Sequence, residues 1–208
     1  MYHGISLITK ESKIDESIRK QLCDHPFFQT PITNLDNQST FIKDYAKSEF
    51  DSLILQFLDE EQYNYSNNYI EYWFQKYDNT NPLGLFPHCD YNDIYRVKMK
   101  DEPEDWPHKL DPNLIVSPIT IAVYLEISND LEGGELNISH RTWYEEQYPI
   151  SVYNSIKQHP FETIVPTQGS VIYFKGSEHY HWINPVIKGC RKSMLINFWP
   201  KDLDQYSD

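Results

Sequence analysis

Hydrophobic positions recur at helical spacing in the first part of the chain. Ser12 is suited to cap a helix in which Ile14, Ile18 and Leu22 recur every fourth residue. A second set of apolar residues, which begins near Ser39, predicts a longer amphipathic helix. Its members are Phe41, Tyr45, Phe50, Leu53, Ile54, Phe57 and Leu58. We expect both helices to cover one face of a sheet.

After Tyr63 the pattern changes to short β-like runs separated by Pro, Gly and Asn clusters. These runs are residues 69–77, 85–90, 119–127, 135–139, 161–165, 170–174, 181–186 and 193–199. Short strands that follow two helices predict a mainly β domain with N-terminal helices (α+β), whose core is a sandwich or jelly roll. We expect one domain over residues 1–208, with a helical buttress at 1–62 and the jelly-roll core at 63–200.

Two irregular stretches interrupt the predicted strands, at residues 91–118 and 140–160. Long insertions in a compact domain often serve as functional lids, although plain surface loops explain them equally well. Arg96, Trp106 and His108 in the first stretch are candidate substrate contacts, and no pattern ranks them.

The composition narrows the class of partners. The 208 residues include 31 Asp and Glu against 18 Lys and Arg, which gives a net charge of −13, and 15% of the residues are aromatic. An acidic surface argues against binding to nucleic acid or to anionic lipid, and the aromatic content argues against disorder. No apolar run approaches the roughly 20 residues of a membrane span.

The cysteines and the N-terminus indicate a cellular compartment. Cys23, Cys89 and Cys190 form no CxxC pair, and the N-terminus lacks the basic start and apolar run of a signal peptide. A sparse, odd number of cysteines fits a reducing compartment. We expect a cytoplasmic protein without a disulfide framework.

His88 and Asp90 lie two residues apart in a predicted strand, in the segment FPHCD. Residues i and i+2 of a strand point to the same face, so the imidazole and the carboxylate are placed to bind one ion together. Cys89 then points the other way, into packing. A His-x-Asp triplet by itself is equally compatible with two polar side chains on the wet face of a strand.

A third candidate ligand lies far downstream. His179 and His181 both qualify, because alternation along a strand turns both to the same face. Two histidines and one carboxylate form the ligand set of non-haem Fe(II) oxygenases, which leaves coordination positions open. A structural zinc site needs four ligands, usually with thiolates, and the cysteines are not placed for that. The residues favour an open iron site, with Arg191 as a lone cation ten positions after His181.

The motifs in their order resemble the prolyl-4-hydroxylase-like branch of the 2-oxoglutarate/Fe(II)-dependent dioxygenases. The His-x-Asp triplet is followed by TIAVYL at 120–125, by GGEL at 133–136, by a strand that ends at Phe174, and by H-x3-PV-x2-G-x-R at 181–191. The match covers residues 69–199, and the ordered set is far more specific than any single motif. The resemblance implies a double-stranded β-helix (jelly-roll) core with buttressing N-terminal helices.

The resemblance assigns the metal ligands to His88, Asp90 and His181, because the family places its last ligand directly before the x3-Pro-Val stretch. His179 is then a neighbour of the site or a surface residue. No catalytic residue beyond the metal centre is implied.

The resemblance also implies that Arg191 binds the distal carboxylate of 2-oxoglutarate, with Tyr77, Tyr124 and Ser193 as further contacts. The alternative for Arg191 is a surface salt bridge, and for the tyrosines it is core packing.

Other residues of these motifs have structural interpretations. Gly133 and Gly134 suit a turn that needs positive φ. Trp182 and Trp199 are candidates to line the site, but large aromatic residues more often belong to the core.

The implied activity is hydroxylation of an unactivated C–H bond. It requires Fe(II), 2-oxoglutarate and O2, with ascorbate as an accessory reductant, and it releases succinate and CO2. Asp90 favours hydroxylation, because related halogenases have a small residue at this position. The implied substrate is a prolyl or other peptidyl residue, or a free amino acid, and the acidic surface tolerates a cationic substrate better than an anionic one.

Two other function classes stay open at this point. One is a cupin-like metalloenzyme that does not use 2-oxoglutarate, which leaves Arg191 and its spacing unexplained. The other is a non-catalytic jelly-roll binding module with a vestigial site, against which the intact ligand set argues. The sequence does not indicate an oligomeric state.

Overall fold

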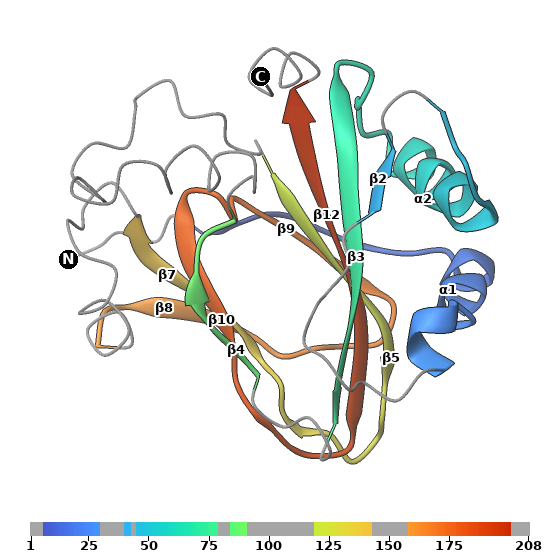
Figure 1. The fold of residues 1–208 in the computed structure, drawn as a ribbon. Helices are drawn as coiled ribbons and strands as arrows, with labels where there is room; N and C mark the ends of the chain where they lie inside the picture. Colours follow the sequence, from blue (N-terminus) through green and yellow to red (C-terminus); the bar gives the residue numbers. More distant parts are fainter. Residues whose placement is uncertain are drawn as a thin grey trace, which may run out of the picture.

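The computed structural model describes residues 6–29, 40–42, 45–78, 84–90, 119–142 and 158–200, which form two antiparallel sheets and two helices (Figure 1). The helices are α1 (Glu16–Cys23) and α2 (Glu49–Glu60), and the 3-10 turn η1 (Pro26–Gln29) follows α1. The major sheet contains, in spatial order, β1 (Ile8–Lys13), β9 (Ser170–Phe174), β5 (Thr120–Ile127), β12 (Cys190–Pro200), β3 (Asn68–Asp78) and β2 (Thr40–Ile42). The minor sheet contains β4 (Leu85–His88), β10 (His179–Ile183), β7 (Leu136–Thr142) and β8 (Phe161–Ile164), and the short strands β6 (Glu132–Gly133) and β11 (Val186–Lys188) form a separate pair.

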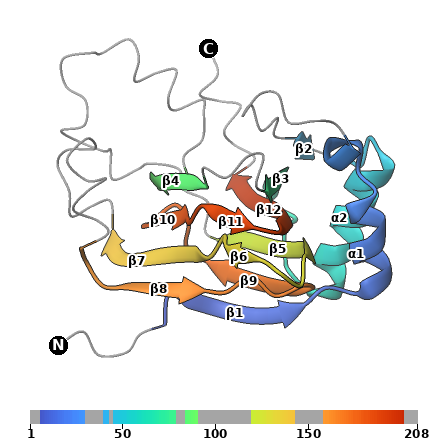
Figure 2. The same ribbon diagram turned by 90° about the horizontal axis from the view of Figure 1, so that it is seen from below.

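The elements form three layers. Both views show the helices on one side of the major sheet and the minor sheet on the other (Figures 1 and 2). This arrangement confirms the predicted mainly β fold with N-terminal helices that cover one face of a sheet, and each predicted strand overlaps an observed one.

Strand β5 shows why the major sheet must be covered on both faces. Residues 120–125 are all buried. Ile121, Val123 and Leu125 pack with the helices, whereas Ala122 and Tyr124 pack with residues between the two sheets. A near-continuous apolar strand is typical of a sheet that is buried on both sides. The inner face, between the sheets, is the one that carries the polar residues described below.

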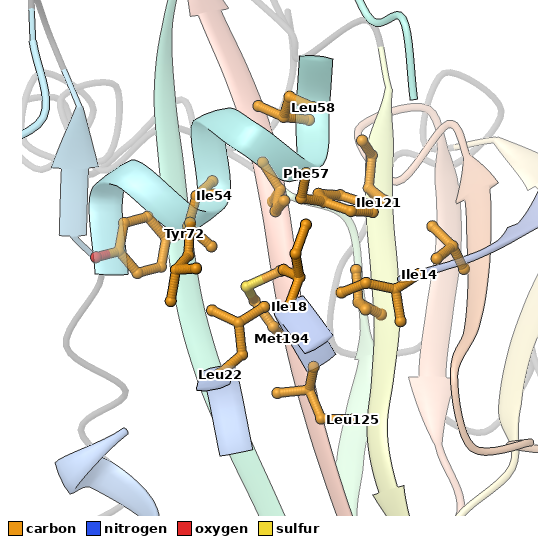
Figure 3. Close-up of a cluster of buried hydrophobic side chains, with 14 of the residues drawn as sticks. Ile14, Ile18, Leu22, Ile54, Phe57, Leu58, Tyr72, Ile121, Leu125 and Met194 are labelled. Atoms are coloured by element: carbon orange, nitrogen blue, oxygen red, sulfur yellow. The ribbon is translucent and has the colours of Figure 1, made fainter. Parts of the chain in front are cut away.

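The helix α1 presents one apolar stripe to the major sheet. The Asp15 carboxylate caps it by accepting hydrogen bonds from the backbone N–H groups of Ser17 and Ile18, at 2.8 and 3.2 Å. Ile18 and Leu22, one turn apart, are buried against the sheet (Figure 3). In the described part of the chain, no helix has the length and apolar character needed to cross a membrane.

The helix α2 is held by a capping box that also joins it to β3. The Ser48 hydroxyl accepts a hydrogen bond from the Asp51 backbone N–H, and the Asp51 carboxylate accepts one from the Ser48 backbone N–H. The Tyr72 hydroxyl of β3 donates to the same carboxylate at 2.8 Å. Ile54, Phe57 and Leu58 complete the core beneath the helix (Figure 3).

The predicted helix cap at Ser12 is wrong. Residues 8–13 form β1, which pairs with β9 at the edge of the major sheet, and the helix begins after Asp15. The Ser12 hydroxyl donates instead to the Glu61 carboxylate at 2.9 Å. Pairing with a distant strand therefore outweighs the local capping preference, and a second good N-cap residue lies only three positions further on.

The predicted start of the second helix near Ser39 is also wrong. Thr40–Ile42 form β2, which pairs with β3, and α2 begins only at Glu49. The expected buttress at 1–62 thus contains two edge strands of the major sheet as well as the helices. The apolar residues at 41 and 42 belong to a strand, so they are not part of the helical repeat of α2.

The positive φ expected at Gly133 and Gly134 is confirmed, and Gly133 is the last residue of the short strand β6. Both residues have positive φ, at 83° and 75°. A Cβ atom on Gly133 would lie 2.0 Å from the Pro185 carbonyl oxygen, so a side chain there would disrupt the pairing of β6 with β11.

His25 predicts a loss of stability in mild acid. Its half-buried ring lies 4.2 Å from the Phe74 ring and 4.3 Å from the Phe50 ring, and its Nδ1 accepts a hydrogen bond from the Phe27 N–H. Burial lowers the pKa of His25 below its usual value of 6.5. Because the unfolded chain then binds a proton that the folded chain does not, the free energy of unfolding should fall as pH drops below 6.5.

The check is urea unfolding of the wild type and His25→Phe between pH 7 and pH 5. The variant keeps an aromatic ring at this position but cannot take up a proton, so its stability should fall less over this interval. Parallel pH profiles for the two proteins would contradict the prediction.

Candidate metal centre

The pairing of β4 with β10 brings two of the predicted ligands together. His88 ends β4 and lies directly opposite His181 of β10. The ring centroids are 4.3 Å apart. Asp90 follows β4, and its backbone N–H donates to the Gly176 carbonyl at 3.0 Å, which holds the residue beside the strand pair. Chain segments far apart in the sequence thus meet at one end of the minor sheet.

The three side chains form a compact set of N, N and O atoms. His88 Nε2 and His181 Nε2 each lie 3.6 Å from Asp90 Oδ1. One ligand atom from each residue lies within 4.8 Å of the others, an arrangement that could hold a metal ion. His181 and Asp90 are buried, whereas the His88 side chain is 31% exposed.

Both imidazoles are oriented from behind by backbone carbonyls. His88 Nδ1 lies 2.8 Å from the Phe86 carbonyl oxygen, and His181 Nδ1 lies 3.1 Å from the His179 carbonyl oxygen. When Nδ1–H donates to a carbonyl, Nε2 is left unprotonated and faces the other ligands. His181 Nε2 is buried and has no hydrogen-bond partner among the described residues. The residues therefore fit a cation at this position.

The electrostatics favour an ionised Asp90. Burial alone raises the pKa of this carboxyl, but the neighbouring imidazoles of His181 and His88 outweigh the effect and hold the pKa well below its usual range. An ionised carboxylate is the form of Asp90 that binds a divalent metal ion.

His179 lies apart from this set. Its Nδ1 lies 3.0 Å from the Ser139 carbonyl oxygen, and burial lowers its pKa. The expectation that His179 and His181 share a face rested on regular alternation, but the pairing of β10 with β7 shifts register between these two residues. Among the described residues, the structure joins only His181 to His88 and Asp90.

The predicted cosubstrate residues lie on the inner face of the major sheet. Arg191 and Ser193 are two residues apart on β12, and they pair with Tyr77 of β3 and Tyr124 of β5 respectively. Arg191 is only 1% exposed. Its Cζ lies 4.9 Å from the Tyr124 ring centroid and 5.7 Å from that of Tyr77. The alternative of a surface salt bridge is wrong for Arg191, because the side chain is buried.

The Arg191 guanidinium is incompletely satisfied. Nη1 donates to the Gly134 carbonyl at 2.8 Å, and Nη2 makes a long contact of 3.5 Å with Ser193 Oγ. Nε has no partner, and no carboxylate of the described ranges forms an ion pair with the group. The hydroxyl of Tyr124, on the same face, is also buried and has no hydrogen-bond partner within the described ranges.

Three further residues of the site escaped the sequence analysis. Gln75 lies two residues before Tyr77 on the inner face of β3, and its buried Oε1 has no hydrogen-bond partner in the described part of the chain. Thr120 and Asn197 are buried and bond to one another, and Thr120 also bonds to Asp90. A signal was present, because polar residues recur at two-residue spacing in these otherwise apolar strands.

The structure places both candidate tryptophans and Cys89 in buried positions. Trp199 is buried and donates through Nε1 to the Glu71 carboxylate at 2.7 Å, and Trp182 is buried with its ring 5.0 Å from that of Phe161. Cys89 is buried, as expected. The irregular stretch 91–118, a lid or a surface loop, lies outside the described residues together with Arg96, Trp106 and His108, and so does most of the stretch 140–160.

Comparison with known proteins identifies the fold. No family model matches the sequence, and no curated protein does. Among solved structures, a Pseudomonas putida prolyl-4-hydroxylase matches with a TM-score of 0.54 and 14% identity, over 92% of this chain and 84% of that chain. The non-haem α-ketoglutarate-dependent carbocyclase SnoK from nogalamycin biosynthesis matches with a TM-score of 0.54 and 11% identity, over 91% and 79%. HygX from Streptomyces hygroscopicus, solved with iron bound, matches with a TM-score of 0.50 and 10% identity, over 92% and 81%.

These matches define the class of fold. The chain has the double-stranded β-helix fold found in prolyl-4-hydroxylases and other 2-oxoglutarate/Fe(II)-dependent oxygenases. This confirms, at the level of the fold, the resemblance seen in the sequence. Beside the edge strand β4 of its minor sheet it carries a His-Asp-His set that could bind a metal ion.

Gly176 provides a test of the metal centre. A Cβ atom at this position would lie 2.3 Å from both Asp90 Oδ2 and Thr120 Oγ1. Gly176→Ala should therefore displace the carboxylate and weaken the binding of Co(II) or Fe(II) about tenfold or more, measured by titration of the metal-free protein. Lys175→Ala, an exposed change in the same turn, is the control and should leave affinity unchanged. A folded Gly176→Ala protein with wild-type affinity would refute this account of the site.

Proposed function

We propose that this protein is a 2-oxoglutarate- and Fe(II)-dependent oxygenase that hydroxylates an unactivated C–H bond. One observation carries the proposal. The described residues contain four buried side-chain polar atoms without a hydrogen-bond partner, and all belong to the faces between the two sheets. They are Gln75 Oε1, Tyr124 Oη, His181 Nε2 and Arg191 Nε. Buried polar groups are nearly always satisfied in proteins, so such a concentration indicates a polar ligand and a cation.

The ligand set supports iron as the resident metal. Two imidazole nitrogens and one carboxylate oxygen, from His88, His181 and Asp90, match the facial set of non-haem Fe(II) enzymes. A structural zinc site would need a fourth ligand, and no fourth His, Cys, Asp or Glu of the described residues belongs to the cluster. The carbonyls that contact Nδ1 of both rings would keep Nε2 available to a bound metal.

Arg191 supports a dicarboxylate as cosubstrate. A guanidinium that is 1% exposed has lost most of its hydration, which costs several kcal/mol unless an anion compensates. A carboxylate bound to its fork would supply that compensation through two parallel hydrogen bonds. We assign this role to the distal carboxylate of 2-oxoglutarate.

The neighbouring side chains would complete the cosubstrate site. The unpartnered Tyr124 hydroxyl can donate to the same carboxylate, and Ser193 offers a second hydroxyl two residues from Arg191. Tyr77 contributes the face of its ring to the guanidinium. Together these groups would orient the cosubstrate and keep water from the guanidinium.

Bound iron and 2-oxoglutarate would supply the activation of O2, with release of succinate and CO2. The chain itself supplies positioning and the exclusion of water, and no described residue needs to act as an acid or base. No observation supports ascorbate, which stays a prediction from the sequence.

For the substrate we propose a prolyl or other peptidyl residue, or a free amino acid. The support is the order of motifs between residues 69 and 199, together with the likeness in fold to the Pseudomonas putida prolyl-4-hydroxylase. The net charge of −13 favours a cationic peptide over an anionic one.

The experiment is an anaerobic titration of metal-free protein with Fe(II) and 2-oxoglutarate, followed by the visible charge-transfer absorption of the complex. The wild type should develop the band, and His181→Ala should abolish it. The control is His179→Ala, which removes a neighbouring imidazole outside the ligand set and should keep the band. Folded, metal-loaded wild-type protein without a band would exclude 2-oxoglutarate and favour a cupin-like metalloenzyme or a binding module.

Arg191 yields a graded prediction in the same assay. Arg191→Lys keeps the charge but loses the planar fork, and Arg191→Ala loses both. A charge-assisted hydrogen bond contributes about 1.5–3 kcal/mol, so Arg191→Ala should weaken 2-oxoglutarate binding by at least roughly tenfold to a hundredfold. The lysine variant should fall between it and the wild type. Equal dissociation constants for 2-oxoglutarate in all three proteins would remove Arg191 from the cosubstrate site.

A further inference from the structure

A chain of hydrogen bonds connects Asp90 to the centre of the major sheet. Thr120 Oγ1, at the start of β5, lies 2.8 Å from Asp90 Oδ2 and also 2.8 Å from Asn197 Oδ1. Thr120 and Asn197 are register partners on β5 and β12, so their side chains point to the same face. All three residues are buried, and Thr120 has no exposed surface at all.

The hydrogen bonds that link Asn197, Thr120 and Asp90 have a defined donor-to-acceptor direction. A hydroxyl has a single proton, and a carboxylate that binds a cation can only accept. Thr120 therefore donates to Asp90 Oδ2 and must accept its second hydrogen bond. In the structure the Asn197 atom that faces Thr120 is Oδ1, which can only accept. If the carboxamide is turned by 180° about its terminal bond, its NH2 group takes this place and donates to Thr120. In that orientation the order of donation is Asn197 to Thr120 to Asp90.

The two oxygens of Asp90 consequently have different environments. Oδ1 faces the Nε2 atoms of His88 and His181, each at 3.6 Å. Oδ2 accepts the Thr120 hydrogen bond and lies against Gly176, where even a methyl group would come within 2.3 Å. One oxygen is open toward the ligand set, and the other is occupied.

We propose that Thr120 and Asn197 are positioning residues that restrict Asp90 to a single metal-binding oxygen. The proposal rests on the metal centre of the proposed function. A carboxylate free to turn would bring both oxygens to the ion and would occupy a position that an open site must keep for its other ligands. The chain Asn197–Thr120 prevents this rotation by fixing Oδ2.

The test measures metal binding rather than activity. Metal-free wild type, Thr120→Val, Thr120→Ser and Asn197→Leu are titrated with Co(II), and both the dissociation constant and the visible d–d spectrum are recorded. Thr120→Val keeps the shape of the side chain but removes the donor, so its affinity should fall about tenfold to a hundredfold and its spectrum should change. Thr120→Ser keeps the hydroxyl and should restore both, and Asn197→Leu should fall between.

The chain offers a matched control. Thr163 Oγ1 donates to Asn137 Oδ1 at 2.8 Å in the minor sheet, a bond of the same type away from the metal ligands. Thr163→Val should leave Co(II) affinity and spectrum unchanged. Wild-type affinity and spectrum in Thr120→Val would overturn the proposal. If that variant does not fold, wild-type affinity and spectrum in Asn197→Leu would overturn it.

The two proposals can fail separately. Wild-type protein that binds Co(II) through Asp90 but gives no charge-transfer band with Fe(II) and 2-oxoglutarate would refute the proposed function, while a hydroxyl-dependent affinity at Thr120 would still support the positioning role. A normal charge-transfer band, together with a Co(II) affinity and spectrum that do not change in Thr120→Val, would refute the positioning role alone. Wild-type protein that binds no Co(II) would refute both.

Discussion

The register of β12 against its two neighbours determines which side chains meet between the sheets. This strand pairs with β3 along its whole length and with β5 over most of it. In that register Arg191, Ser193 and Asn197 point to the inner face, while Met194, Ile196 and Phe198 pack with the helices. A slip by one residue would exchange the two sets and place a guanidinium beneath the helices. Burial of the apolar residues on one face of β12 therefore fixes the register that turns its polar residues to the inner face.

This division explains how the chain tolerates so many buried polar groups. The core between the helices and the major sheet is almost entirely apolar and can supply most of the stability. The space between the sheets contains apolar residues too, but it also holds a guanidinium, a carboxylate and several unpaired polar atoms. Each buried polar group without a hydrogen bond lowers the free energy of unfolding, and these groups all lie in the space between the two sheets. A ligand and an ion that satisfied these groups would stabilise the fold as they bind.

The sequence predicts the strands well because period-two alternation is local. It also predicts that the His88 and Asp90 side chains lie together, since the two residues are only two positions apart, although β4 ends at His88 and Asp90 follows it. It does not predict β1 or β2, which are strands only because distant partners lie beside them, and it assigned the cap of α1 to Ser12 instead of Asp15. The choice between His179 and His181 required the family resemblance, because the irregularity that separates them arises from the pairing with β7. Thr120 and Asn197 were missed because their role depends on a contact with Asp90 across the space between the sheets.

The same strand serves both ends of the proposed site. Arg191 and Asn197 lie six residues apart on β12, roughly 20 Å along an extended strand, and an even separation keeps them on one face. Arg191 would bind the cosubstrate, and Asn197 would act through Thr120 on the carboxylate that binds the metal. Because β12 is hydrogen-bonded on both sides, neither residue can shift without disturbing two strand pairings. A rigid central strand is therefore the element that relates the two halves of the site to one another, while the imidazoles come from the minor sheet on the opposite side. Apolar residues of both sheets pack against one another in this space, and the Asp90–Thr120 hydrogen bond adds a polar contact between the metal-binding carboxylate and the major sheet.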